Sequence, residues 1–156
     1  MQFLCQEAES LFFQEWKTVD ILSEETMQAA IEATSSYFAR RENVHFACVF
    51  GSFADARATT ASDLDVAIAG LEPFSLEQKL DFQLELSEQL QREVDVVDLN
   101  TSHGAILEAA LTKGRQLFCK NPSVRENLLK RMLREHEDDG RFAEKILTER
   151  LKLWQS

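Results

Sequence analysis

Three short apolar stretches constrain the fold of this chain more than any other feature of its sequence. They are 44–50 (VHFACVF), 63–69 (DLDVAIA) and 94–99 (VDVVDL). Apolar runs of this length, bounded by turn signals, are typical of strands buried inside a sheet. Amphipathic segments of helical length separate them. The sequence therefore predicts an α/β or α+β fold in which helices flank a small mixed sheet.

Helix signals surround these strands. Ser23 stands before two glutamates and supplies an N-cap with an acidic first turn, which predicts a helix over 24–41. Ser75 and Gln78 form a capping box for the helix that follows the second strand. The remaining expected elements are a helix over 3–16, a helix over 102–112 closed by Gly114, a strand over 116–119, and a helical segment that begins at Pro122 and breaks near 138–140.

The length of the chain fits a single domain. It has 156 residues, of which 44% are hydrophobic, including 11 Phe, so it can bury a sizeable core. We expect an N-terminal extension over 1–22, also helical, a core over 23–120 and a helical segment over 121–156.

The charge is acidic and unevenly distributed. The formal net charge is −10, with −13 over residues 1–100 and +3 over residues 101–156. Phosphate backbones are bound by surplus Lys and Arg, so the balance argues against direct binding of nucleic acid. The acidic part can host cations. A basic segment such as 125–134 is more often a solvated helix face than a binding surface, and it is where we look for partner contact.

The cysteines and the N-terminus indicate a cytoplasmic protein. Cys5, Cys48 and Cys119 form no CxxC pair and have no close His, which predicts free thiols in a reducing compartment. Acidic residues precede the first basic one, the wrong charge for a secretory signal, and no apolar run is long enough to span a membrane.

The strongest chemical signal is Gly51-Ser52, a spacer of ten residues, and Asp63-Leu64-Asp65. Residues i and i+2 of a strand share a face, so the two aspartates present their carboxylates toward one point. Such close like charges are tolerated mainly around a cation, and hard oxygen ligands select Mg²⁺ or Mn²⁺. A glycine turn can hold phosphate oxygens through its N–H groups and the Ser52 hydroxyl. The pattern predicts a metal-dependent nucleotide site.

In-line displacement with two metal ions usually needs a third carboxylate, and the third strand offers Asp95 and Asp98. Their separation of three points them to opposite faces. Asp95 lies between two valines, where an unpaired carboxylate is unfavourable without a metal or donor, so we prefer it. Asp98 is expected to act as a cap or turn acid, and it stays the alternative.

These residues resemble the signature of the polymerase β-like nucleotidyltransferase superfamily. The chain is most similar to its minimal nucleotidyltransferases (MNT), especially the MntA antitoxins of HepT/MntA (HEPN/MNT) toxin–antitoxin pairs. In those proteins the KGRQLF stretch at 113–118 and a helical tail also recur. The resemblance implies a polymerase β-like nucleotidyltransferase fold with a helical C-terminal tail.

The resemblance also implies a reaction. It is the Mg²⁺-dependent transfer of AMP from ATP to a tyrosine hydroxyl of a partner HEPN-domain ribonuclease toxin, which neutralises the toxin. Gly51 and Ser52 would hold the triphosphate, Asp63 and Asp65 two metal ions, and Asp95 would be the third ligand and the base. Self-association and a hetero-oligomer with the toxin are both open.

One segment departs from the pattern of the relatives. They read G-S-aromatic-A-x-G, whereas here Ala56 stands at the usual glycine and Asp55 adds negative charge beside the phosphate path. If that position needs a positive φ, alanine strains or reshapes the turn. Two alternatives therefore stay open: an antitoxin that acts by binding only, and a nucleotidyltransferase for small molecules, against which the absence of a substrate domain argues.

Overall fold

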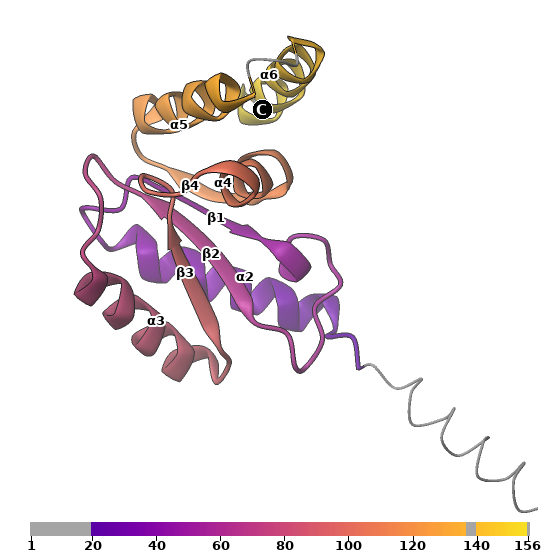
Figure 1. Ribbon diagram of the computed structural model, residues 1–156. Coiled ribbons are helices and arrows are strands. Elements are labelled where there is room, and N and C mark those ends of the chain that lie inside the picture. Colours follow the sequence, from indigo (N-terminus) through magenta and orange to yellow (C-terminus); the bar gives the residue numbers. More distant parts are fainter. Residues whose placement is uncertain (1–19, 137–139, 156) are drawn as a thin grey trace, which may run out of the picture.

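The computed structural model describes residues 20–136 and 140–155. Four strands form one sheet in the order β3-β2-β1-β4, in which β1 is antiparallel to β2 and β4, and β2 is parallel to β3 (Figure 1). The mixed sheet flanked by helices confirms the predicted fold class. The elements are α2 (Glu24–Ala39), β1 (Phe46–Phe50), β2 (Leu64–Ala69), α3 (Leu76–Leu90), β3 (Val94–Asp98), α4 (Gly104–Glu108), β4 (Arg115–Cys119), α5 (Pro122–Glu135) and α6 (Gly140–Gln155).

The predicted caps are present at the helix starts. Ser23 accepts a hydrogen bond from the third residue of α2, and Ser75 and Gln78 form the reciprocal capping box of α3. The helix expected over 102–112 is divided into α4 and a π-helical turn over Ala109–Lys113. The helix expected over 3–16 and the break near 138–140 fall on residues outside the described part.

Helices cover both faces of the sheet (Figure 1). On one face, α2 and α3 pack through a core that includes Phe38, Val66 and Leu86. On the other face, α4, α5 and α6 pack through a second core that includes Leu107 and Met132. Side chains alternate along each strand, so β2 contributes to both cores in turn, whereas β3 contributes Val94 and Val96 to the first core.

The sheet topology brings the ends of three strands together. Phe50 at the end of β1 pairs with Asp65 near the start of β2, because these strands are antiparallel. Asp65 in turn pairs with Asp95 near the start of β3, because these strands are parallel. The turn that begins at Gly51 therefore lies at the same end of the sheet as both carboxylates.

The expectations about membrane-spanning segments and free thiols concern the helices and the cysteines of the structure. Within the described residues, no helix combines the length and apolar character needed to cross a membrane. Cys48 and Cys119 are free thiols, Cys48 fully buried and Cys119 partly so. Cys5 lies outside the described residues.

Candidate active site

The turn after β1 approaches β2 closely. Gly51 has a φ of +70°, and a Cβ at this position would lie 2.5 Å from Oδ2 of Asp65. The left-handed backbone favours glycine, and a Cβ here would displace the Asp65 carboxylate. The chain continues as one 3-10 turn, Gly51–Phe53, in which the Phe53 ring is buried in the core. The glycine of the motif thus sets the backbone directly against a carboxylate.

Asp65 is the central carboxylate of the site. It lies beside Asp95 in the β2–β3 register, and Asp63 stands two residues earlier, just before β2 begins. Burial, followed by the negative charges of Asp95 and Asp63, raises the pKa of Asp65 above its ordinary value. Across the part of the chain that the structure describes, no Lys or Arg forms an ion pair with any of the three. They form an acidic cluster without a compensating cation.

The donor chemistry of this cluster suits Mg²⁺, because oxygen ligands of like charge need a cation between them. Among residues 20–136 and 140–155, however, no group of three or more His, Cys, Asp or Glu is close enough to hold a metal ion. Asp63 and Asp95 are exposed and Asp65 is partly buried, so two of the three side chains have room to rotate. Metal binding stays a prediction.

Asp98 has a structural role. Its side chain is 2% exposed, and it accepts hydrogen bonds from the backbone N–H groups of Phe74 at 2.8 Å and Asn100 at 2.9 Å. These bonds join the end of β3 to the segment that leads into α3. Asp98 is therefore a turn acid, as predicted, and it points away from the face that carries Asp95.

The spacer after the glycine turn contains the departure from the family pattern. Ala56 has a φ of +56°, so this position does require the left-handed conformation that costs an L-residue about 1–2 kcal/mol. Asp55 is held by Arg57, with 2.8 Å between Oδ2 and Nη2. The added negative charge is therefore accompanied by an adjacent guanidinium.

Arg92 anchors the spacer, a role that sequence reasoning missed. Its Nη1 donates to the backbone carbonyl oxygens of Thr59, at 3.1 Å, and of Ser62. Its guanidinium carbon also lies 5.2 Å from the centre of the Phe53 ring. Arg92 follows α3 and is 30 residues from Ser62, so no local pattern reveals the contact. It fixes the loop that joins the two halves of the motif.

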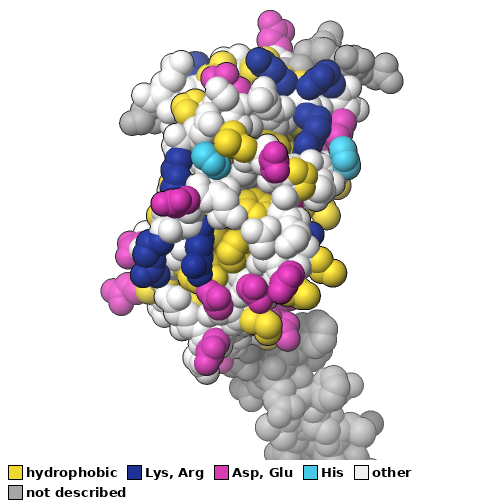
Figure 2. Space-filling view, turned by 90° about the vertical axis from the view of Figure 1, so that its left-hand side faces the viewer, with side chains coloured by type: hydrophobic (Ala, Val, Ile, Leu, Met, Phe, Trp, Pro, Cys, Tyr) yellow, Lys and Arg dark blue, Asp and Glu magenta, His cyan; other side chains and the backbone are white. Residues whose placement is uncertain are grey.

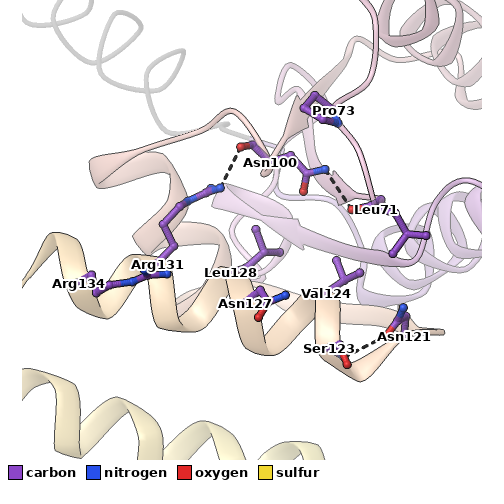
Figure 3. A pocket seen from close by; sticks show the side chains of 11 residues that line it. Leu71, Pro73, Asn100, Asn121, Ser123, Val124, Asn127, Leu128, Arg131 and Arg134 are labelled. Atoms are coloured by element: carbon purple, nitrogen blue, oxygen red, sulfur yellow. Dashed lines mark hydrogen bonds between the residues drawn. The ribbon is translucent and has the colours of Figure 1, made fainter.

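The basic face at 125–134 is used partly inside the molecule. Arg131 donates to three backbone carbonyl oxygens in the turn after β3, including that of Asn100 at 2.9 Å (Figure 3). The guanidinium of Arg125 lies 4.1 Å from the centre of the Trp154 ring in α6. Two arginines of the segment where we looked for partner contact therefore stabilise the fold.

Residues 32–123 match the family described as Polymerase beta, Nucleotidyltransferase, over more than half of the chain. The chain belongs to this family. The matched segment of this nucleotidyltransferase contains the glycine turn, the spacer and all three carboxylates of the cluster. Among curated protein sequences, none matches the chain.

Three solved structures share the fold of this nucleotidyltransferase. A minimal nucleotidyltransferase is 31% identical with a TM-score of 0.50, over 64% of this chain and 97% of that one. A toxin–antitoxin complex with AMP-PNP is 17% identical with a TM-score of 0.54, over 86% and 97%. A tri-AMPylated Shewanella oneidensis HEPN toxin in complex with MNT antitoxin is 15% identical with a TM-score of 0.52, over 80% of this chain and 96% of that one. The predicted polymerase β-like fold is confirmed.

Proposed function

We propose that this nucleotidyltransferase transfers AMP from ATP to a tyrosine hydroxyl of a HEPN-domain toxin and thereby neutralises it. The observation that carries the proposal is the uncompensated cluster of Asp63, Asp65 and Asp95 against the backbone of Gly51. The family match supports nucleotidyl transfer. The likeness in fold to a toxin–antitoxin complex with AMP-PNP and to an antitoxin with an AMPylated HEPN toxin supports the substrate and the partner.

The glycine turn is the part that would bind the triphosphate. Gly51 has no side chain, so the backbone N–H groups of the turn can approach phosphate oxygens closely. The Ser52 hydroxyl, half-buried in the same turn, would donate a further hydrogen bond. Arg92 keeps the following loop in place, which would limit the positions that the nucleotide can take.

Asp63, Asp65 and Asp95 would hold two Mg²⁺ ions, which would offset the repulsion among the three carboxylates. When bound, the ions neutralise charge on the phosphates and favour ionisation of the acceptor hydroxyl. Asp95, which is exposed, would accept the proton of the tyrosine hydroxyl. The hydroxyl oxygen then bonds to the α-phosphorus of ATP, the bond from that phosphorus to the bridging oxygen breaks, and pyrophosphate leaves.

Mass spectrometry of the partner tests the proposal. The wild type is incubated with ATP, Mg²⁺ and the HEPN-domain protein encoded beside it, and we expect the partner to gain the mass of one or more AMP groups. Asp65→Asn should abolish the gain. Glu72→Gln, an exposed acid after the other end of β2, is the control and should leave it unchanged. A partner whose mass does not change with the wild type would overturn the proposal.

Neutralisation by binding alone is the second candidate, and Ala56 is the observation that favours it. A left-handed alanine beside the phosphate turn is a departure that an inactive antitoxin tolerates without consequence. In that case Asp63→Asn combined with Asp65→Asn should protect cells from the toxin as well as the wild type does. Loss of protection in the double variant would support catalysis.

A further inference from the structure

A groove between α3 and the edge strand β3 opens beside the acidic cluster. It has a volume of about 420 Å³ and is lined by Asp63 and Asp95 on one side and by Leu80 and Leu84 of α3 on the other. The two aspartates on its wall belong to the proposed catalytic cluster, and Asp95 is its proposed base. Val94 and Val96 pack in the core beneath α3, so Asp95 between them points to the opposite face of the sheet, and the groove meets the acidic cluster around the exposed edge of β3.

Helix α3 has apolar side chains on two faces. Phe82 and Leu86 are buried against the sheet. Leu76, Leu80 and Leu84 follow one another at intervals of four, so they share the outer face, where they are 69%, 46% and 69% exposed. A helix that contacts its own protein on one side normally has a polar outer face. An exposed apolar stripe of this kind is typical of an interaction site.

The free edge of β3 is closed to a further strand. The Val94 N–H donates to Oγ of Ser87 at 3.1 Å, and the Val96 N–H donates to Oε1 of Gln83 at 3.4 Å. Strand addition needs unbonded donors on the edge, and α3 already occupies these two. A partner must therefore bind in this groove through its side chains.

The surface around the groove is acidic. Glu93 lines it together with the two aspartates, and no Lys or Arg is among the residues that line it. Glu77, Asp81 and Glu88 are exposed on the flank of α3 beside the leucine stripe. Figure 2 faces this side of the molecule and shows hydrophobic and acidic side chains interspersed over the right of its lower part, with Lys and Arg side chains at the left. The groove is complementary to a surface that combines apolar side chains with Lys or Arg.

We propose that this groove receives the partner segment that carries the acceptor hydroxyl, with apolar side chains against Leu80 and Leu84 and a basic side chain beside Glu93. The inference rests on the proposed function, because it names the docking surface for the same reaction. The groove sets specificity: a hydroxyl reaches Asp95 only when its flanking segment fits. The transfer is the one given above, in which the hydroxyl oxygen bonds to the α-phosphorus, pyrophosphate leaves and the proton passes to Asp95.

Leu84→Glu tests this surface, and Leu71→Glu is its matched control. Leu71 is 70% exposed but lies after the far end of β2, away from the groove. We expect Leu84→Glu to raise the KM for the HEPN-domain partner by about tenfold or more, because burial of a leucine is worth about this factor. kcat and the KM for ATP should not change. Leu84→Ala should raise the same KM by a smaller factor, and Leu71→Glu should leave all three constants unchanged.

An unchanged KM for the partner in Leu84→Glu would overturn the inference, and so would an equal rise in the KM for ATP, which indicates general damage to the site. Dissociation constants for the partner, measured without ATP, separate the inference from the proposed function. If the wild type binds the partner without transferring AMP, and Leu84→Glu weakens that binding, the proposed function fails and the docking surface stands. If AMP transfer is intact in Leu84→Glu at every partner concentration, the docking surface fails and the function stands.

Discussion

Ala56 adopts a conformation that favours glycine, so Ala56→Gly should stabilise this protein. Its φ of +56° lies in the left-handed region, where the Cβ of an L-residue crowds the backbone. Removing that crowding gains about 1–2 kcal/mol. Glycine also has more conformational freedom in the unfolded chain, which costs about 0.5–1 kcal/mol. The difference between the central values of these two ranges predicts a gain of about 0.75 kcal/mol in the free energy of unfolding.

Ala54→Gly is the matched control in the same loop. Ala54 has φ of −70° and ψ of −33°, a right-handed conformation that alanine adopts without strain. Only the entropy of the unfolded chain changes there, which predicts a loss of about 0.5–1 kcal/mol. The two variants carry the same chemical change and should shift stability in opposite directions.

Urea titration followed by circular dichroism measures both effects. Equal slopes m in the three proteins are needed for the midpoints to report stability. In a thermal melt, each 1 kcal/mol corresponds to about 2–4 °C for a chain of this length. If Ala56→Gly lowers the midpoint as Ala54→Gly does, the left-handed conformation stores no strain and the reasoning is refuted.

Three further changes test the site and its support. Gly51→Ala should lower the free energy of unfolding by more than about 1 kcal/mol and abolish AMP transfer, because its Cβ would meet Asp65. Gly104 is the control: its φ is +59° and no atom lies within 4 Å, so Gly104→Ala introduces only backbone strain. Equal losses of stability in urea titration would contradict the close contact at Gly51. Asp65→Asn should stabilise the metal-free protein by about 0.2–1 kcal/mol at neutral pH, since like charges on paired strands repel. The pKa of Asp65 in the folded protein is raised above its ordinary value of 3.8, so the carboxyl becomes neutral as the pH falls through the folded pKa, and the gain in stability should disappear there. Thermal melts in which the gain persists at low pH would contradict the repulsion. Arg131→Met should lower the free energy of unfolding by about 1–3 kcal/mol, because it leaves three carbonyl oxygens without their donor. Arg134 is exposed on the same helix, so Arg134→Met should lower it by less than about 0.5 kcal/mol in the same titration.

The strands, the caps and the chemical motif could be predicted because each depends on residues that are close together in the sequence. The capping box of Ser75 and Gln78 needs only the spacing of one helical turn, and it is present as expected. The motif joins a glycine turn to a pair of acids through a spacer whose length can be read directly from the sequence. Even the left-handed position of Ala56 could be anticipated, because the motif that the chain resembles has glycine there.

The sequence alone determined which residues make the motif: a strand ends in a glycine turn, and ten residues later a second strand starts with two acids. The tertiary structure decided which distant residues serve it. Asp95 joins Asp65 only because β3 pairs in parallel with β2 in one register, and Arg92 supports the spacer across 30 residues. It also turned Arg131 inward, to carbonyl oxygens that would otherwise lack donors. Such choices depend on how helices pack on the sheet, which no local pattern encodes.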